Sequence, residues 1–381
     1  CHRKALILKF WWSTENIKRD IRVIKKQIII ASTYCEDLAK LFNYINFEVV
    51  AITHYNSLDL KKYCKKIYIV KDYNLKTLKK LFLENDPYLE KSFLLGSGFA
   101  ENHKKSKIFS DRKNYGNNFK VNDLVKNKEF FKKLKQNQIL FPKLINNGSL
   151  RKTLIKNIKS FGSQNIKKSN CKDYKLKKNE YFQEFINGEN MSVQFISDMD
   201  ELKIVSVCEQ VLKKETFFID YLITKKLSKN KQDQIYNLIK KIVKIFKLRG
   251  INNVDLIYKK KKLYVIEINS RPGLSTNIIF KINQGPFIKN KKKLQKKFLA
   301  TKIIYSSKKL IINKKIINFF KEHCTSKNFS ELPNERDVIK VNQPICLLHL
   351  MAKTKKLLEK KLNIETNYFL KKIEKIYEQR N

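Results

Sequence analysis

Short apolar runs alternate with a helical pattern near the start of the chain, and this alternation restricts the fold more than any other feature of the sequence. Each run has the length and apolar character of a buried strand, and the helix after the first run has one apolar face. Strands that alternate with helices build parallel sheets, so residues 27–115 are predicted to form a small parallel α/β domain. The strands are predicted at residues 27–31, 48–52, 66–70 and 92–95, and the helix at residues 36–44.

A turn with two glycines, Gly96-Ser-Gly98, follows the last of these strands. It is similar to a phosphate-binding turn, but the third glycine of that fingerprint is replaced by Glu101. We therefore interpret it as a strand-to-helix turn that lines a substrate pocket. Glu101 could then touch substrate at the pocket edge.

The middle of the chain predicts a second, larger unit of strands and helices. It begins with a helix over residues 122–138, whose apolar face includes Phe130 and Phe131. Turn-rich sequence is predicted around Pro333 and Pro344. The remaining elements are three strands at 152–156, 181–185 and 191–196, a helix at 229–246, a hairpin of strands 253–258 and 263–269, a strand at 301–305 and a terminal helix.

The composition limits the classes of function that the chain can have. At 381 residues it is long enough for two or three domains, and its net charge of +47 favours polyanions at low salt. Lysine, asparagine and isoleucine are spread along the whole chain, whereas specific phosphate or base recognition favours arginine. Compositional drift explains this spread more simply than a dedicated site, so we expect no specific nucleic-acid partner. A basic nucleic-acid-binding protein stays open as an alternative.

The cysteines and the apolar segments indicate a cytoplasmic protein. The seven cysteines are scattered and form no CxxC pair, which supports neither a disulfide framework nor a zinc site. No apolar run approaches the roughly 18 residues of a membrane span. Residues 1–26 lack a small-residue cleavage site and are interpreted as an amino-terminal extension rather than a signal peptide. We expect no membrane partner, and the oligomeric state cannot be read from the sequence.

The predicted hairpin carries a polar set on one face. Alternate residues of a strand share a face, so Glu267, Asn269 and Arg271 are predicted to lie together. Ile266 and Ile268 are predicted to point into the core instead. A solvated hairpin face that happens to carry polar residues is the alternative interpretation.

The hairpin turn also brings a second carboxylate to this face. Because the turn is centred between residues 260 and 261, Asp255 is predicted to lie almost opposite Glu267. Carboxylate and amide oxygens are ligands that Mg²⁺ or Mn²⁺ prefers, and they are usually joined by substrate phosphates. Arg271 lies two residues beyond Asn269, where it could steady a transferring phosphoryl group.

Three segments resemble parts of ATP-grasp enzymes. The segment from residue 250 to residue 273 resembles their metal-binding end, which shows an Asp or Glu and then Glu-x-Asn-x-Arg. Residues 181–189 resemble the adenine hinge. Residues 153–163 resemble the strand lysine and the small-residue loop that cover the nucleotide phosphates. The three segments occur in the order that the family has.

The wider chain is similar to one branch of that superfamily, the predicted ATP-dependent carboligases related to biotin carboxylase. This similarity covers about residues 27–350. It implies an α/β protein with an ATP-grasp fold, in which ATP and Mg²⁺ activate a small-molecule carboxylic acid as an acyl phosphate. An amine or similar nucleophile then captures that acyl group. The implied parts are residues 1–26 as an extension, 27–115 as the α/β pre-domain, 116–290 as the ATP-grasp domain, and 291–381 as a carboxy-terminal extension that packs on it.

The resemblance also implies roles for single residues. Asp255, Glu267 and Asn269 would ligate Mg²⁺, and Arg271 would be catalytic by stabilising the acyl phosphate. The sequence does not choose between Lys126 and Lys128 as the second lysine on the phosphates. The other implied nucleotide contacts are Lys156 and Gly162 on the phosphates, the backbone of Gln183, Glu184 and Ile186 on adenine, and Glu189 or Asn190 on the ribose.

The phosphate loop departs from the family pattern. It keeps one glycine, Gly162, where the family usually has two or more, and it contains the bulky Phe161. Glycine tolerates the unusual backbone angles that let a loop approach phosphates closely. A noncatalytic or degenerate ATP-binding protein is therefore a second alternative.

Overall fold

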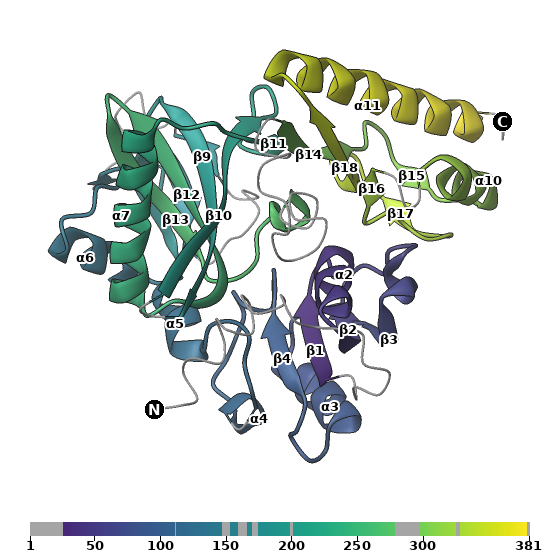
Figure 1. Ribbon diagram of the computed structural model, residues 1–381, viewed down its shortest axis with the longest axis horizontal. Coiled ribbons are helices and arrows are strands. Elements are labelled where there is room, and N and C mark those ends of the chain that lie inside the picture. Colours follow the sequence, from purple (N-terminus) through teal and green to yellow (C-terminus); the bar gives the residue numbers. More distant parts are fainter. Residues whose placement is uncertain are drawn as a thin grey trace.

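The computed structural model describes residues 26–110, 112–146, 153–158, 166–169, 174–198, 201–278, 297–324 and 328–378. Figure 1 shows three groups of elements around a common centre. The amino-terminal α/β unit lies at the bottom of the view. The first strands of the largest sheet lie on the left with the long helix α7, and the carboxy-terminal elements, which include its last strands, lie at the upper right.

The amino-terminal group is a four-stranded parallel sheet with the strand order β3-β2-β1-β4. This confirms the parallel α/β unit. The central strand β1 is buried on both faces because helices α2 and α3 cover opposite sides of the sheet. The strands and helices are β1 (Lys26–Ser32), α2 (Glu36–Tyr44), β2 (Phe47–Thr53), η2 (Leu60–Lys62), β3 (Cys64–Ile69), α3 (Leu75–Asn85), β4 (Ser92–Leu95) and α4 (Lys107–Ser110).

The largest sheet has eight strands in the order β13-β12-β9-β10-β11-β14-β18-β16, and neighbouring strands are antiparallel. Helix α7 (Lys229–Phe246) matches its predicted bounds and packs its apolar face on β9, β12 and β13. Two of its strands, β10 and β11, lie in segments for which the sequence predicted no strand. The strands here are β9 (Glu189–Asp198), β10 (Glu201–Leu212), β11 (Ile219–Thr224), β12 (Arg249–Lys259) and β13 (Lys262–Asn269).

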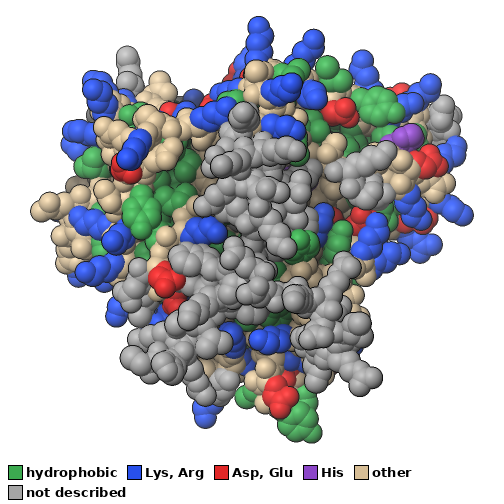
Figure 2. All heavy atoms as spheres, in the orientation of Figure 1, with side chains coloured by type: hydrophobic (Ala, Val, Ile, Leu, Met, Phe, Trp, Pro, Cys, Tyr) green, Lys and Arg blue, Asp and Glu red, His purple; other side chains and the backbone are tan. Residues whose placement is uncertain are grey.

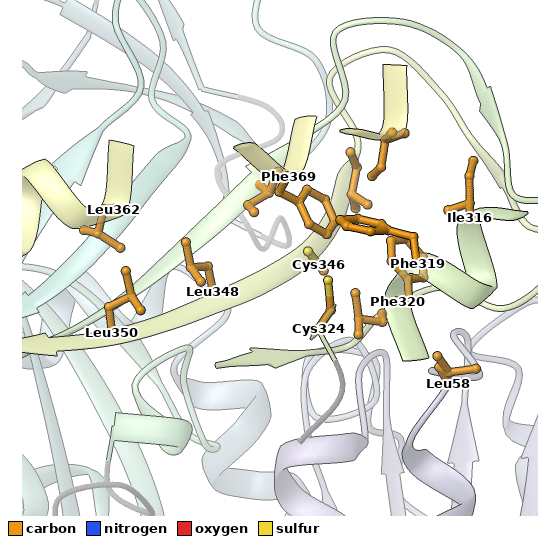
Figure 3. Packing of buried hydrophobic residues seen from close by; sticks show 14 of the residues in the cluster. Leu58, Ile316, Phe319, Phe320, Cys324, Cys346, Leu348, Leu350, Leu362 and Phe369 are labelled. Atoms are coloured by element: carbon orange, nitrogen blue, oxygen red, sulfur yellow. The ribbon is translucent and has the colours of Figure 1, made fainter. Parts of the chain in front are cut away.

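The carboxy-terminal strands continue the same sheet, because β11 pairs with β14. Helices α10 and α11 cover them. Phe369 of α11 stacks on Phe320 in the core, with ring centroids 5.8 Å apart (Figure 3). It also stacks on Phe329, with ring centroids 5.2 Å apart. In the described part of the chain, no helix combines the length and apolar character needed to cross a bilayer. The elements are β14 (Phe298–Tyr305), β15 (Leu310–Ile311), α10 (Lys314–Phe319), η3 (Phe320–Cys324), β16 (Phe329–Ser330), β17 (Val338–Ile339), β18 (Pro344–Ala352) and α11 (Lys355–Glu378).

Two smaller sheets complete the described architecture. One has four short strands in the order β5-β8-β6-β7, and the other pairs β15 with β17. Strands β6 and β8 confirm the predicted strands at 152–156 and 181–185. The domain boundaries predicted at residues 115 and 290 stay predictions. The remaining elements are α5 (Phe119–Leu124), α6 (Glu129–Gln136), β5 (Leu144–Ile145), β6 (Thr153–Asn157), β7 (Lys167–Lys168) and β8 (Glu180–Glu184).

Two sequence predictions about single elements are wrong. The helix predicted over residues 122–138 is broken into α5 and α6, because the Asn127 side chain accepts a hydrogen bond from the amide of Glu129 (2.8 Å) and starts a new helix. The break turns the Lys126 side chain inward, where it is buried. The stretch around Pro344 is the start of β18 rather than a turn, since proline is tolerated at the first residue of a strand.

One glycine fixes how the parallel sheet meets the large sheet. Gly250 in β12 has φ +70°, and a Cβ there would overlap the carbonyl oxygen of Tyr115. The side chain of Asn117 also connects the two sheets, because its nitrogen donates to Asn252 Oδ1 (2.7 Å) and to the carbonyl of Ser270 (2.9 Å). The end of the parallel unit is therefore joined to both ends of the hairpin β12–β13.

We expect Phe369→Ala to lower the free energy of unfolding by about 3–5 kcal/mol, because it leaves a cavity in a fully packed aromatic core. Denaturant unfolding followed by circular dichroism measures this change. The neighbouring Tyr368→Ala is the matched control, since Tyr368 is 46% exposed and its loss should cost about 0.5 kcal/mol or less. Equal destabilisation by the two variants would contradict the packing described for α11.

Candidate active site

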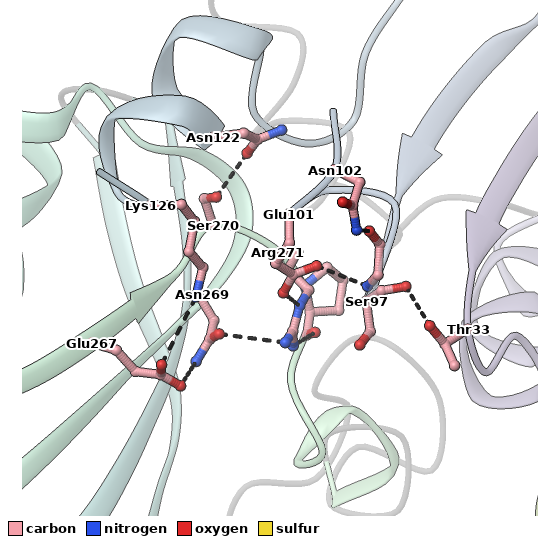
Figure 4. A network of polar contacts seen from close by, with 12 residues as sticks. Thr33, Ser97, Glu101, Asn102, Asn122, Lys126, Glu267, Asn269, Ser270 and Arg271 are labelled. Carbon is pink, nitrogen blue, oxygen red and sulfur yellow. Dashed lines mark hydrogen bonds and ion pairs between the residues drawn. The ribbon is translucent and has the colours of Figure 1, made fainter. Parts of the chain in front are cut away.

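The hairpin β12–β13 brings its two carboxylates together as predicted. Asp255 is the register partner of Glu267, which confirms the predicted pairing. The amide nitrogen of Asn269 donates to Glu267 Oε1 (2.9 Å), as Figure 4 shows. The same nitrogen donates to Asp255 Oδ2 (3.3 Å) and so lies between the two carboxylates. Two side chains that the sequence did not single out orient Asp255: Gln210 of β10 and Asn253 donate to its Oδ1 at 2.8 and 2.9 Å.

A β-bulge corrects one prediction about this hairpin. Asp255 pairs with Glu267, but the next residue, Leu256, pairs with Val265, so Ile266 is the extra residue of β13. Val265 and Ile268 are both fully buried in the core, because the extra residue shifts the alternation by one position. Ile266 is half-buried and lines the cavity described below, so the prediction that it points into the core is wrong.

Arg271 is held by a carboxylate from the parallel sheet. Its Nε donates to Glu101 Oε1 at 2.7 Å, and the two side chains are only 11% and 3% exposed. The other oxygen of Glu101 accepts from the amide of Gly98 (2.8 Å), so Glu101 is committed to Arg271 and to its own turn rather than to substrate (Figure 4). Burial opposes ionisation of Glu101, but Arg271 and then Lys126 hold its pKa below its usual range.

Two lysines lie beside the carboxylates. Lys126 Nζ is 3.8 Å from Glu267 Oε2, and Lys156 of β6 is buried and lines the same cavity. Burial lowers the pKa of Lys156, which Glu267 and Asp255 oppose. Lys128, the other lysine considered from the sequence, is exposed and is not part of the cavity wall.

The two carboxyl groups of the hairpin, Asp255 and Glu267, differ in pKa. Burial, and then the charge of Glu267, raise the pKa of Asp255 to about 7. Burial also works against the charged form of Glu267, but Lys126 and the Asn269 amide lower its pKa to about 2. Glu267 is therefore the stronger acid of the two, and a cation beside the pair would favour the ionised form of Asp255 as well.

These side chains form one wall of a cavity of about 840 Å³. Residues of the predicted adenine hinge form another part, with Gln183, Glu184 and Ile186 in the lining. Gln183 is fully buried and its Nε2 donates to the Pro142 carbonyl (3.2 Å), while its Oε1 has no hydrogen-bond partner among the described residues. At Gly188, a Cβ would overlap Ile257, so only glycine lets the hinge approach β12 this closely.

The structure does not bring every predicted residue to the cavity. Glu189 lies on the face of β9 turned away from it, where Lys231 donates to the carboxylate at 3.2 Å and Lys225 also forms an ion pair. Its neighbour Asn190 lies in the lining, since successive strand residues alternate between faces. The interpretation of Glu189 as a ribose contact is thus not supported by its position. Gly162 and Phe161 lie outside the described residues.

The donor set at the hairpin fits Mg²⁺ or Mn²⁺ in its chemistry. Within the described ranges, no group of three or more His, Cys, Asp and Glu side chains could hold a metal ion by itself. Two carboxylates and an amide suit an ion that takes one or two protein carboxylates and completes its shell with phosphate oxygens and water. The Asn269 nitrogen now lies between Asp255 and Glu267, and a half-turn of the amide would present its oxygen there instead.

Residues 125–275 match the family model described as an ATP-grasp domain. This segment is therefore similar to an ATP-grasp domain. It contains all the residues named above from β12 and β13, both lysines and the hinge, whereas Glu101 comes from outside it.

Solved structures with the same fold cover nearly the whole chain. A biotin carboxylase from Campylobacter jejuni, solved as a complex with β,γ-ATP, has a TM-score of 0.66 at 13% identity and covers 92% of this chain and 95% of its own. An L-amino acid ligase from Bacillus licheniformis has a TM-score of 0.61 at 12% identity and covers 93% of this chain and 98% of its own. At these identities the likeness establishes the ATP-grasp fold.

A curated relative matches over a shorter segment. The carbamoyl phosphate synthase large chain of Clostridium acetobutylicum is 25% identical over 108 residues. The match spans 28% of this chain but only 10% of that much longer protein.

The far side of the cavity contains a second carboxylate pair, which joins α2 to the segment after β16. The amide of Glu36 donates to Glu331 Oε1, and the amide of Glu331 donates to Glu36 Oε2, both at 2.9 Å. Both residues are buried. Burial and then Asp37 raise the pKa of Glu36 to about 7, and burial and then Glu36 raise the pKa of Glu331.

This pair predicts a pH-dependent stability. The pKa of Glu36 is about 7 in the folded state against an ordinary 4.5, so the folded state binds the proton more tightly. The stabilisation from this proton is complete below pH 4.5 and is lost as pH rises towards 7. We expect Glu36→Gln, whose amide oxygen can still accept from Glu331, to gain up to about 3 kcal/mol relative to the wild type across that window. The ionisable groups around Glu36 are Asp37, Asp59, Tyr63, Glu331 and Cys346.

Chemical denaturation at a series of pH values measures the difference between the two proteins. Glu90→Gln, which changes an exposed carboxylate, is the matched control and should show no such trend. A difference between Glu36→Gln and the wild type that stays constant from pH 4.5 to 7.5 would contradict the protonated pair.

Proposed function

We propose that the protein is an ATP- and Mg²⁺-dependent ligase that joins a small-molecule carboxylic acid to an amine or similar nucleophile. The observation that carries this proposal is the meeting of Asp255, Glu267, Arg271 and two lysines on one wall of a large cavity in an ATP-grasp domain. The structural neighbours support it, since one is a biotin carboxylase with a bound ATP analogue and another is an L-amino acid ligase.

In the proposed reaction a carboxylate oxygen of the acid attacks the γ-phosphorus of ATP, and ADP leaves. The amine then attacks the acyl carbon, phosphate leaves, and the amine nitrogen releases a proton. Little covalent chemistry falls to the protein in such phosphoryl transfers, so its residues act by positioning and by charge. Lys126 and Lys156 would hold phosphate oxygens, and Arg271, fixed by Glu101, would stabilise the charge that develops on the transferred group.

Asp255, Glu267 and Asn269 would hold the metal ion, whose charge offsets that of the phosphates. Gln210 and Asn253 keep the Asp255 carboxylate turned into the cavity for this purpose.

Adenine would lie at the hinge between apolar side chains. Leu154, Ile186 and Leu256 line this part of the cavity. The buried Oε1 of Gln183 needs a donor, because its amide nitrogen is already bound to Pro142. The exocyclic amino group of adenine is such a donor, and we propose that Gln183 contacts it through its side chain as well as its backbone.

The location and partners of the protein are further proposals. The cysteines that the structure describes are free thiols, which supports a reducing compartment such as the cytoplasm. On the face shown in Figure 2, Lys and Arg side chains are scattered among other types and do not gather into one patch. This distribution supports small-molecule substrates rather than a specific nucleic-acid partner. The proposed parts remain a pre-domain to about residue 115, the ATP-grasp domain to about 290, and the carboxy-terminal extension.

Acid-dependent release of ADP tests the proposed reaction. We expect purified protein with Mg·ATP to release ADP when pools of carboxylic acids and amines are added, and Asp255→Asn combined with Glu267→Gln to abolish the release. A coupled assay for ADP measures this. Nucleotide binding without release in any pool would instead support a noncatalytic ATP-grasp protein. Release that the double variant leaves unchanged would contradict the assignment of the hairpin.

The two lysines flanking the helix break provide a matched pair of variants. We expect Lys126→Met to reduce the rate of ADP formation about 100-fold, because it removes a buried positive charge beside the transferred group. Lys128→Met should change the rate less than about twofold, since that side chain is exposed. Steady-state kinetics with thermal unfolding as a folding control distinguishes them. The reverse order would overturn the proposed role of Lys126.

A further inference from the structure

The charged residues that line the cavity differ in sign between its two sides. On the ATP-grasp side, the lining includes Lys126, Lys156, Lys168 and Arg271 as well as acids. Outside residues 125–275, every charged side chain in the described lining is acidic. This occurs in a chain with 82 Lys and Arg residues against 35 Asp and Glu residues, so it is not a consequence of composition. These acids are Asp37, Glu331 and Asp337.

Glu331 has an oxygen without a partner. Its side chain lines the cavity although the residue is only 8% exposed. Its Oε1 accepts from the amide of Glu36, but its Oε2 has no hydrogen-bond partner among the described residues. Burial and then Glu36 raise the pKa of Glu331, and a cation beside this oxygen would favour the ionised form of the side chain. The backbone of Glu331 has φ +56° and is fixed by its own bond to Glu36, so the side chain is held in place.

The neighbouring Asp37 adds negative charge. It accepts hydrogen bonds from the amide of Asn277 (2.5 Å) and from the hydroxyl of Ser330 (3.5 Å), and both of these donors are uncharged. These contacts orient the carboxylate. Asp37 and Glu331 therefore present acidic groups from α2 and from the segment after β16 to the same cavity.

Two aromatic rings complete this part of the lining. Tyr34 and Tyr55 are stacked with their ring centroids 4.7 Å apart and their planes parallel within 1°. Both line the cavity, and Tyr55 is 45% exposed. The faces of aromatic rings attract organic cations, and carboxylates beside them strengthen the attraction. We call Tyr34, Asp37, Tyr55, Glu331 and Asp337 the acidic wall.

We propose that the acidic wall binds an ammonium group of the nucleophile substrate. This inference rests on the proposed ligase function, because it identifies the bound cation as part of the amine that the enzyme joins to the activated acid. Neighbouring carboxylates favour the protonated form of an amine, and a protonated amine has no lone pair with which to attack. The group held at the acidic wall is therefore an anchor, and a second amino group of the same compound is the nucleophile.

Binding of small molecules of matched length tests the proposal. Diaminobutane, butanediol and butanedioate carry ammonium, hydroxyl or carboxylate groups at both ends of one four-carbon chain. The net charge of +47 disfavours nonspecific uptake of a dication, so saturable binding of diaminobutane reports a specific site. We expect equilibrium dialysis in moderate salt to show diaminobutane binding at least 10-fold more tightly than butanediol, and butanedioate not competing with it.

Variants locate the site. We expect Glu331→Gln to weaken diaminobutane binding at least 10-fold, since the amide oxygen can still accept from Glu36 while the side chain can no longer ionise beside an ammonium group. Asp37→Asn should act in the same direction and serves if Glu331→Gln does not fold. Asp220→Asn is the matched control, because Asp220 pairs with Lys302 outside the lining, and it should leave binding within twofold. Diaminobutanoate, a four-carbon diamine that also carries a carboxylate, distinguishes a basic amino acid from a free diamine.

The outcomes separate this inference from the proposed function. If diaminobutane binds no more tightly than butanediol, or if both acidic-wall variants bind it like the wild type, the ammonium site is wrong even where acids stimulate ADP release. If diaminobutane binds as expected but no acid stimulates ADP release, the ammonium site stands as a binding site and the ligase reaction is wrong.

Discussion

The ion pair between Arg271 and Glu101 is the interaction on which the active site depends most. The two residues are 170 positions apart in sequence, and their side chains are almost fully buried. Removing one partner of such a pair leaves an uncompensated charge, which costs about 3–5 kcal/mol in typical cases. Because Glu101 also binds the amide of Gly98, the guanidinium is fixed to the turn that ends β4. The phosphate end of the cavity therefore exists only where the parallel sheet and the ATP-grasp domain are docked.

The same docking gives the cavity basic side chains at one end and acidic side chains at the other. Lysines and Arg271 surround the end where phosphates would lie, and the acidic wall faces it from the parallel sheet and the carboxy-terminal elements. A ligase of the proposed kind has to bind a nucleotide triphosphate and an amine together, and their charges differ in sign. A net charge of +47 already attracts anions to the protein, whereas a cation binds only where carboxylates outnumber basic side chains locally.

Local patterns in the sequence were sufficient for much of the fold and for part of the site. The apolar runs predicted the parallel strands, and the hairpin turn placed Asp255 opposite Glu267. Alternation failed at Ile266, because a bulge inserts one residue and reverses the side-chain direction. Alternation also could not tell whether Glu189 faces the cavity. Which residues of β9 face the cavity depends on which side of the sheet α7 covers.

Contacts between distant segments were outside the reach of such reasoning. The choice between Lys126 and Lys128 depends on a helix break at Asn127. The bond from the Glu129 amide to the Asn127 side chain is local, but it competes with a strong helical pattern. The partners of Arg271 and Asp255 come from Glu101 and from Gln210, which no spacing rule connects to the hairpin. The acidic wall combines residues almost 300 positions apart, and it becomes visible only when the cavity is assembled.

Glu331 links the packing of the protein to its proposed recognition of substrate. Helix α2 has Cys35 at its N-cap, and this side chain makes no capping hydrogen bond. Glu331 supplies the missing acceptor to the amide of Glu36 with one oxygen, and its other oxygen has no hydrogen-bond partner among the described residues. Two buried acids in contact repel each other when both are ionised, so the contact is weakest at high pH and in the absence of a cation. An ammonium group beside Glu331 would relieve that repulsion. Binding of the amine would then tighten the joint between α2 and the carboxy-terminal elements, and with it the wall on which the amine rests.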